Sequence, residues 1–555
     1  MAFPSPAPKK QVEPQEVQLK IAGGNNFGRY NKISDEQTWN MIVSDGALVD
    51  YAGYQNVFAE PLVANGKGRG IYSSVNGGFM VVVIGSGVWT VTFNNAQELT
   101  ANFVGTLATS QGDVFISENN VRQICITDGT HLYVSNYMLN PLSFGTLQTS
   151  VFVTSFPGPT PGANQFNVPF VHPGYISYQL DRMIVADNGT QAWYLSGSQN
   201  ATQWSPIDIN NKAYGGSISL KPDHIQAAVP FPGAGNNIAI FGHTVVELWI
   251  YSGNTLFPYQ RQTTFNVDYG CLNPSSIAAL DSYIVWLSSN EQGGATVMAM
   301  NGAGGREESI STDGMDFKLA NLTNPSNCTG FLFRQDGHLL YQFTFPDDNL
   351  SYVYDFNTKL FFTVSDENQN FHIARNVVFF DNDYYFVSLN DGNVYIFGTQ
   401  FSNLRYSSTN VQMMPRIRIC PPIRLPNQRM FIAKSLGFTI ENGQPNEPIQ
   451  VFGEAYLITQ DGNMLVTQSG DYLVTQDQWL TLDGLYPEAI DLSISRDGAE
   501  SFGNSVRYTM NRTGNRKSRL IFQRLGQAND FTAMIRFIGY GRFVAVGDGI
   551  VEAYS

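Results

Sequence analysis

One motif recurs through most of the chain: an apolar run, a tight polar turn and a second apolar or aromatic run. β-Branched and aromatic residues on both sides of turns such as Asp128-Gly129 and Asp391-Gly392 are typical of β-hairpins. Copies of the motif begin at Phe79, Val121, Asp181, Asn237, Asp281, His338 and Asp383. This repeat constrains the fold more than any other feature of the sequence.

Successive copies start about 42 to 60 residues apart, which leaves room for a hairpin and its outer strands. A period in this range predicts the blades of a β-propeller, because a small sheet cannot bury both of its faces alone. A closed ring of sheets buries them and leaves few free edges. We therefore expect an all-β fold with a β-propeller of six or seven blades. A large β-sandwich or tandem barrels remain the alternative, and the missing β/α alternation disfavours a Rossmann-type fold.

Changes in composition indicate further segments on either side of the repeats. Pro4, Pro6, Pro8 and Pro14 favour an extended arm, and residues 405–434 combine basic residues with prolines, as linkers do. The predicted segments are an extended N-terminal arm (1–22), the β-propeller (23–404), a linker with the first part of a second β domain (405–452), a repeat-containing β insertion (453–490) and C-terminal strands that complete the second domain (491–555).

A short repeat with a period of eight residues occupies 457–480. Its units begin at Leu457, Leu465 and Leu473, and each combines a Leu-Ile/Val-Thr-Gln strand with a turn. Such a unit has few apolar residues and needs a neighbour or a symmetry mate to bury them. The repeat predicts a small β projection, which is either a surface hairpin or an interaction module.

The charge balance limits the partners of the chain. Its 555 residues include 32 Lys and Arg against 46 Asp and Glu, a formal charge of −14. This acidity argues against a protein that grips nucleic acid by neutralising phosphates. No stretch approaches the roughly 18 apolar residues of a transmembrane helix, and the N-terminus lacks the apolar core of a secretory signal. The apolar content of 43 % excludes wholesale disorder.

Patterns that carry catalytic, cofactor or metal chemistry are not found. The six histidines are far apart and the four cysteines form no CxxC pair, so no short-spaced metal motif exists. Residues 66–70 are glycine-rich but lack the spacing of a phosphate loop, and carboxylate pairs such as Asp347-Asp348 lie in predicted turns. We expect no catalytic, cofactor-binding or metal-binding residue, no cofactor and no enzymatic activity.

Two further motifs lie near the C-terminus. Residues 495–502, from Ser495 through Asp497 to Phe502, resemble an Asp-box, a turn motif of sialidases and other propellers that holds a turn and is not catalytic. A basic stretch contains Arg507, Arg512, Arg516, Lys517, Arg519 and Arg524. Apolar residues interleaved with these cations favour docking to an acidic partner or neutralisation of nearby carboxylates over contact with DNA phosphates.

Several blocks of the sequence resemble the packaged-DNA stabilisation proteins of short-tailed bacteriophages, also called tail hub or nozzle proteins. The blocks are Gly28-Arg29-Tyr30 with Asn40-Met41 and Gly53-Tyr54, Arg69-Gly70-Ile71-Tyr72 with Gly85-Ser86-Gly87-Val88-Trp89, Phe241 to Cys271, and Ser518-Arg519-Leu520 with Arg524-Leu525-Gly526. Together they extend over about four-fifths of the chain. The order of the blocks carries the resemblance, and the N-terminal arm and the octapeptide repeat depart from it.

The resemblance implies a structural virion protein: a homohexamer below the portal and head-to-tail adaptor rings that retains packaged DNA and provides the channel for DNA ejection. It also implies assembly in the host cytoplasm, a place in the virion tail, docking of tail fibres or spikes and of a tail plug or needle, and passage of double-stranded DNA without specific binding. No catalytic residue or cofactor follows from it. A propeller glycosidase or a carbohydrate-binding tail protein remains the alternative.

Overall fold

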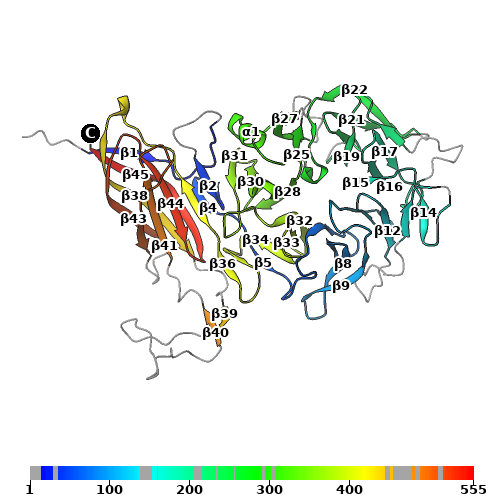
Figure 1. The fold of residues 1–555 in the computed structure, drawn as a ribbon, viewed down its shortest axis with the longest axis horizontal. Helices are drawn as coiled ribbons and strands as arrows, with labels where there is room; N and C mark the ends of the chain where they lie inside the picture. The colour runs from blue at the N-terminus through cyan, green and yellow to red at the C-terminus, as the bar shows by residue number, and fades with distance from the viewer. Residues whose placement is uncertain are drawn as a thin grey trace, which may run out of the picture.

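The structure is a computed structural model that describes residues 14–28, 36–137, 153–158, 160–204, 215–232, 235–254, 257–289, 294–301, 307–443, 450–453, 478–481, 488–510 and 517–554. A ring of small sheets lies beside a second β domain (Figure 1). The expected all-β fold with a propeller is confirmed.

The first four sheets of the ring follow one another in sequence. They contain β6 (Gly68–Ser73), β7 (Met80–Ile84), β8 (Gly87–Phe93) and β9 (Leu99–Thr106); then β10 (Phe115–Glu118), β11 (Gln123–Thr127), β12 (Leu132–Asn136), β13 (Val153–Phe156) and β14 (Gln165–Asn167); then β15 (Pro173–Gln179), β16 (Arg182–Asp187), β17 (Ala192–Leu195) and β18 (Gly215–Ser217); then β19 (Ile225–Pro230), β20 (Ile238–Gly242), β21 (Val246–Tyr251) and β22 (Tyr259–Val267).

Three more sheets complete the ring. The fifth contains β23 (Gly270–Cys271), β24 (Ala278–Leu280), β25 (Tyr283–Ser289), β26 (Ala295–Asn301) and β27 (Glu307–Ser309); the sixth β28 (Thr329–Gln335), β29 (His338–Phe345), β30 (Leu350–Asp355) and β31 (Leu360–Thr363); the seventh β32 (Ala374–Phe380), β33 (Asp383–Ser388), β34 (Val394–Gly398), β5 (Gly53–Asn56), β35 (Asn403–Arg405) and β36 (Val411–Met413). Helix α1 (Asp313–Ala320) and the short turns η2 (Pro274–Ser276), η3 (Pro346–Asp348) and η4 (Pro426–Gln428) lie between strands.

Each sheet packs on the next, and the seventh packs on the first through β32 and β6. Seven hydrophobic clusters fill the seven spaces between neighbouring sheets. The two faces of one strand therefore belong to different clusters: Ile124 and Ile126 of β11 face the first sheet, and Cys125 faces the third. Strands such as β7 are buried along their whole length because both faces are covered. The described residues thus form a ring of seven blades.

The ring is closed by a strand from outside the blade sequence. β5 precedes the first blade in the chain but pairs antiparallel with β34 of the last blade, with Tyr54 opposite Phe397 and Gly53 opposite Gly398. A closed ring leaves fewer unpaired edges than an open array of sheets.

The second domain is a pair of sheets around one core. The first sheet contains β1 (Gln15–Leu19), β3 (Met41–Ser44), β4 (Ala47–Asp50), β45 (Arg542–Tyr554), β38 (Phe431–Gly443) and β43 (Lys517–Ala528), and the second β2 (Gln37–Trp39), β37 (Arg416–Ile419), β44 (Thr532–Ile538), β41 (Ala489–Ser495) and β42 (Val506–Thr509). Leu436, Phe522 and Phe537 lie in the core between them. β2 also pairs with β31, so the second sheet continues the sixth blade.

The structure divides the N-terminal residues differently from the sequence analysis. Strand β1, expected in an extended arm, pairs with β45, and so does β4, expected in the propeller. A hairpin pattern in the sequence does not say which sheet the hairpin joins, and here the partner is the last strand of the chain. Residues 1–13 and most of the octapeptide repeat 457–480 lie outside the described residues. From that insertion only β39 (Gln450–Gly453) and β40 (Gln478–Thr481) are described, and they pair with each other.

The close contacts of Gly53 in the closing strand give a first prediction. A Cβ atom there would lie 2.5 Å from the Asn403 carbonyl oxygen and 2.6 Å from that of Phe401, both backbone atoms. We expect Gly53→Ala to lower the free energy of unfolding by about 1–3 kcal/mol in denaturant titrations, because overpacking forces the backbone apart. The matched control is Gly437→Ala in β38, where the nearest atom to the new Cβ is 3.7 Å away. Equal stabilities of the two variants would contradict the prediction.

Candidate functional site at the ring axis and the domain junction

An open hollow of about 230 Å³ lies on the ring axis, lined by residues on or beside the innermost strands of six of the seven blades. Its aliphatic lining includes Ile71, Val114, Ile116, Ile176, Ile277 and Leu332. No Asp, Glu, Lys, Arg or His is among the described residues around it, and burial raises the pKa of Tyr175 to about 12. These residues offer no carboxylate or imidazole as general acid or base.

A second hollow of about 420 Å³ contains one carboxylate, that of Glu118. Glu118 is 6 % exposed, and its oxygens accept hydrogen bonds from the Ser74 hydroxyl and the Val75 N–H, each at 3.0 Å, and from the Tyr137 hydroxyl. Glycoside hydrolysis uses a pair of carboxylates on either side of the scissile bond. The described lining of this hollow provides one carboxylate, and its oxygens already accept hydrogen bonds from neighbouring residues.

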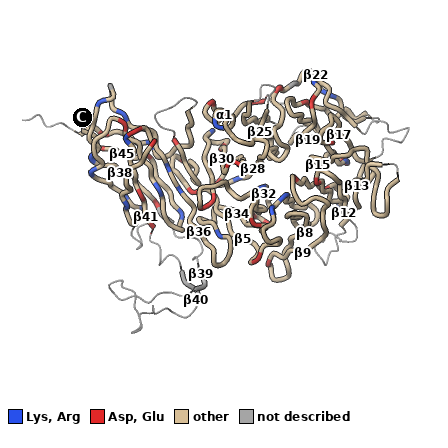
Figure 2. Tube along the Cα trace, in the orientation of Figure 1, with Lys and Arg blue, Asp and Glu red and all other residues tan. Residues whose placement is uncertain are grey.

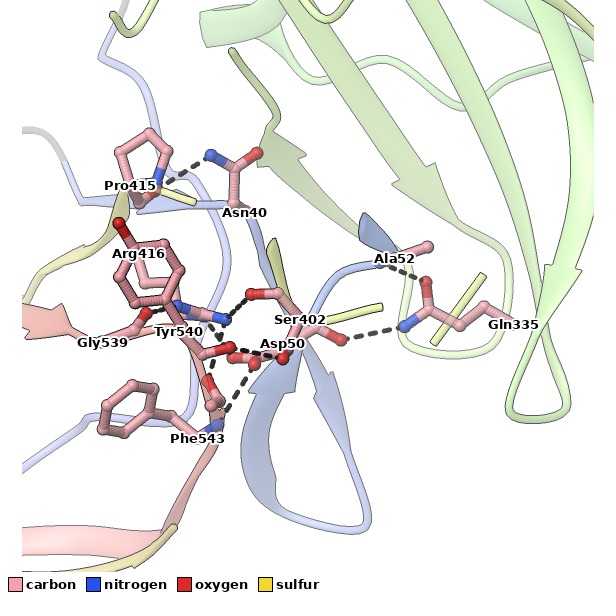
Figure 3. Close-up of polar contacts among 11 residues, drawn as sticks. Asn40, Asp50, Ala52, Gln335, Ser402, Pro415, Arg416, Gly539, Tyr540 and Phe543 are labelled. Atoms are coloured by element: carbon pink, nitrogen blue, oxygen red, sulfur yellow. Dashed lines mark hydrogen bonds and ion pairs between the residues drawn. The ribbon is translucent and has the colours of Figure 1, made fainter. Parts of the chain in front are cut away.

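The domain junction holds a buried pair of opposite charges. Arg416 at the start of β37 is 1 % exposed, and its Nε donates to the Asp50 carboxylate at 2.8 Å (Figure 3). Its Nη1 donates to the carbonyl oxygen of Gly539 at 3.0 Å, and its Nη2 donates to those of Ser402 and of Gly541. One guanidinium thus joins β4, the end of the propeller and the β44–β45 turn.

Asp50 connects this arginine to the sixth blade. Its side chain also accepts from the Phe543 N–H at 3.1 Å, and its carbonyl oxygen accepts from the Gln335 amide at 3.0 Å. Gln335, at the end of β28, in turn accepts from the Ala52 N–H at 3.1 Å (Figure 3). Burial raises the pKa of the Asp50 carboxyl and the guanidinium of Arg416 opposes that rise. The paired cation satisfies a charge that would otherwise be costly to bury.

Other polar links tie the same two domains together. Asn40 accepts from the Ser365 N–H at 2.8 Å and donates to the Pro415 carbonyl oxygen at 2.9 Å. Within the second domain, beside this link, fully buried Arg418 of β37 donates to Glu36 at 2.9 Å. The junction is therefore a network rather than a single contact.

A Ser–His–Asp chain also crosses the junction. The His338 ring lies 2.9 Å from the Asp355 carboxylate through Nδ1 and 3.1 Å from the Ser44 hydroxyl through Nε2. Hydrolases use this order of groups. Here Asp355 also accepts from the Asn357 N–H and the Thr358 hydroxyl, and none of the three residues lines the two hollows described above. We interpret the chain as a tether between the β3–β4 hairpin and the sixth blade.

The motifs considered in the sequence have structural roles where the structure describes them. Arg69, within the glycine-rich motif 66–70, is 2 % exposed and donates to the carbonyl oxygens of Gly85, Thr109 and Gly112. The carboxylate of Asp348 accepts from the Thr323 N–H at 2.8 Å and so holds a turn. Across the described residues, no group of three or more His, Cys, Asp or Glu side chains is arranged to hold a metal ion.

The Asp-box-like turn forms as the sequence suggests, although it lies in the second domain. Asp497 accepts from the Ser495 hydroxyl at 2.6 Å and from the Ser501 N–H at 3.1 Å. These hydrogen bonds, first those from the Ser495 and Ser501 side chains, lower the pKa of Asp497 to about 2. The motif holds a turn.

The basic stretch divides into paired and exposed cations. Arg507 donates to both carboxylate oxygens of Asp491 at 2.8 Å, and this hydrogen bonding lowers the pKa of Asp491. Lys517, Arg519 and Arg524 on β43 are exposed, and Arg512 and Arg516 lie outside the described residues. Among the described cations of this stretch, only Arg507 therefore neutralises a nearby carboxylate.

Sequence reasoning missed the junction residues. Arg416 and Arg418 stand in a stretch that looks like a basic, proline-rich linker, yet both are buried. Their acidic partners, Asp50 and Glu36, are 366 and 382 residues away in the chain. The alternation Arg416-Ile417-Arg418-Ile419 indicates a strand, but no local signal shows that its polar face is covered.

Comparison with models of protein families shows which known proteins this chain is related to. The family model described as "Bacteriophage P22 Gp10, beta-propeller" matches residues 36–402, about two thirds of the chain. The chain belongs to this family of phage packaged-DNA stabilisation proteins. The match begins beside β2 and ends at Ser402, so it includes the first six blades, β32 to β34 of the seventh and the closing strand β5. The family is one of structural tail nozzle proteins that stabilise packaged DNA, which makes this chain a virion component.

Other comparisons add little. No curated protein matches the chain significantly. Among solved structures, virginiamycin B lyase from Staphylococcus aureus is 10 % identical with a TM-score of 0.37 and covers 70 % of this chain and 99 % of its own. A putative 6-phosphogluconolactonase from Bacteroides uniformis is 13 % identical with a TM-score of 0.34 (53 % and 82 % covered), and the N-terminal domain of Nup159 is 12 % identical with a TM-score of 0.36 (62 % and 95 % covered). Likenesses this distant say nothing about what this family member binds. No helix of the described residues is long and apolar enough to cross a membrane.

The buried ion pair gives a second prediction. We expect Asp50→Asn to lower the free energy of unfolding by about 3–5 kcal/mol, because it leaves the Arg416 charge buried without its carboxylate. The control is Asp491→Asn, which breaks the pair with Arg507, whose side chain is 59 % exposed, and costs under about 1 kcal/mol. Urea titration and limited proteolysis of the segment between the domains measure both. The prediction fails if the two variants lose the same stability.

The buried histidine near the junction gives a third prediction. Burial among aromatic rings that include Tyr51 and Tyr54 lowers the pKa of His372 from 6.5 to about 3. The folded state therefore binds fewer protons than the unfolded chain between these values. The stability that neutral His372 contributes is complete above pH 6.5 and falls as the pH drops toward 3, by up to about 1.4 kcal/mol per pH unit.

His372→Phe keeps an aromatic ring in this place and removes the titration. It also removes the 3.3 Å hydrogen bond from the Ala374 N–H to Nδ1, which shifts stability equally at all pH values. We expect the variant to lose less stability than the unchanged protein between about pH 6.5 and pH 4 in urea titrations. Parallel stability curves for the two proteins would show that His372 does not contribute.

Proposed function

We propose that this chain is a subunit of a homohexameric tail nozzle that lies below the portal and head-to-tail adaptor rings. In this role it retains packaged DNA and provides the channel through which the DNA is ejected. It assembles in the host cytoplasm and carries docking surfaces for tail fibres or spikes and for a tail plug or needle. The family match over residues 36–402 is the observation that supports this proposal most strongly.

The ring axis supports a channel formed between copies rather than through one propeller. The axial hollow of about 230 Å³ is lined mainly by apolar side chains and has room only for a small cluster of water molecules. The major groove of double-stranded DNA alone is wide enough to admit an α-helix. The whole duplex is therefore much wider than this hollow and cannot pass through it. A DNA channel therefore has to lie between several copies of the chain.

The charge of the chain suits a channel that DNA passes without adhering. The formal charge is −14, and the described acidic and basic residues are distributed over both domains (Figure 2). Six copies together surround the channel with a strong excess of negative charge, which repels phosphates. The two hollows described above supply no pair of carboxylates. A third, of about 340 Å³, is lined by Asp313 and Asp316, both on helix α1.

A depletion experiment tests the role. Particles produced without the protein are expected to lose packaged DNA, measured as DNA that becomes sensitive to nuclease, and added purified protein is expected to restore retention. Electron microscopy of the restored particles is expected to show six copies around one channel. Particles that keep their DNA without the protein, or a channel lined mainly by Lys and Arg, would contradict the proposal.

A further inference from the structure

One side of the first sheet of the second domain combines exposed aliphatic residues with cations. We call it the outer sheet face: the solvent-facing side of β45, β38 and β43. Ile432, Ile521 and Ile550 are 52 %, 45 % and 47 % exposed on it, while their chain neighbours Phe431, Phe522 and Val551 are buried on the core side. Isolated exposed aliphatic residues are ordinary, but a group of them on one sheet marks an interaction site.

Gly437 forms a notch in the middle of this face. It lies opposite Ile521 on one neighbouring strand and opposite Ile550 on the other. A Cβ atom at this position would find the Leu520 carbonyl oxygen at 3.7 Å and the Ile521 side chain at 3.9 Å, so packing within the chain does not require glycine. Glycine within a strand costs about 0.5–1 kcal/mol relative to alanine. The notch fits a side chain that comes from another molecule.

Exposed cations lie along the same strand as Ile521. Lys517, Arg519 and Arg524 are exposed on β43, and none of them forms an ion pair with a residue that the structure describes. β43 is also the edge of its sheet, since it pairs with β38 alone among the described strands. Tyr508 of β42, the edge strand of the second sheet, contacts Phe522, so the two edges lie together.

Two other roles for these residues are weaker. Charged residues and bulges on an edge strand prevent unwanted pairing, but this does not explain the exposed isoleucines or the glycine between them. A DNA-binding site uses cations to neutralise several phosphates, and these cations are rarely interleaved with exposed aliphatic residues. An acidic, partly apolar polypeptide fits both features of the face.

The chain itself contains such a polypeptide. Residues 442–488 contain no Lys or Arg, and their carboxylates are Glu447, Glu454, Asp461, Asp471, Asp477, Asp483 and Glu488. The described part of this stretch is the two-stranded sheet of β39 and β40, which lies apart from both domains (Figure 1). A two-stranded sheet alone is at best marginally stable in water, so this pair of strands needs a surface to pack on.

We propose that the outer sheet face binds the acidic β39–β40 stretch of a second copy of this chain. The aliphatic residues around Gly437 receive apolar side chains, and Lys517, Arg519 and Arg524 pair with carboxylates of the neighbouring copy. The outer sheet face of one copy binds a different surface, the β39–β40 stretch, of the next copy. Such a contact repeats from copy to copy and can close into a ring. The inference rests on the proposed multi-copy nozzle and names the surfaces that join its subunits.

A charge exchange on the full chain tests the contact. Arg519→Glu with Arg524→Glu, and separately Asp477→Lys with Asp483→Lys, are each expected to weaken self-association at least about tenfold, and all four changes together are expected to restore it. Lys67→Glu with Lys359→Glu is the control, since it makes the same change of charge on exposed propeller residues. Molar mass from light scattering, with and without purified portal–adaptor rings, measures assembly.

A steric variant separates docking from folding. Gly437→Val fills the notch, and its Cβ atom would meet no protein atom closer than 3.7 Å, so we expect a thermal unfolding midpoint close to that of the unchanged protein but weaker assembly. Assembly that is unaffected by Gly437→Val and by Arg519→Glu with Arg524→Glu overturns the inference and leaves the proposed function standing. The inference is also overturned, and the proposed function still stands, if these variants assemble normally but no longer bind a duplex DNA probe. If the unchanged protein stays monomeric even with portal–adaptor rings, the proposed function fails first.

Discussion

One buried guanidinium holds the architecture together. The chain crosses from the second domain into the propeller just after Asp50. Arg416 binds this point, the Ser402 carbonyl oxygen next to β35 of the last blade, and the β44–β45 turn. A buried charge is tolerated only where its partners are close and complete. This ion pair, together with the pairing of β2 with β31, fixes the orientation of the propeller relative to the second domain.

Closure of the ring depends on the same place. Strand β5 begins three residues after Asp50 and completes the seventh blade, so a shift at the junction would move the strand that closes the ring. Tyr51 and Tyr54 follow Asp50 where the chain enters the propeller. Both pack on the buried His372, which lies just before β32 of the last blade. Seven small sheets, none of which could bury both faces alone, thus become one rigid body.

This arrangement leaves the propeller with little chemistry of its own. The hollow on its axis is lined mainly by apolar side chains, and the carboxylate of Glu118 in the neighbouring hollow accepts hydrogen bonds from the fold. What a nozzle subunit needs is instead a rigid body with surfaces for its neighbours. The second domain supplies such surfaces, because its outer sheet face and its open edges are not covered by the described part of the chain.

The sequence alone determined the local elements. Alternating apolar residues and turns such as Asp128-Gly129 specify hairpins, and their spacing specifies a propeller, because strands and tight turns form from residues close together in the chain. The Asp497 turn was visible for the same reason. The tertiary structure decided which strand closes the ring, why β1 joins β45, and that Arg416 and Arg418 are buried cations rather than a basic linker. Those contacts join residues hundreds of positions apart, and only the closed ring brings them within hydrogen-bonding distance.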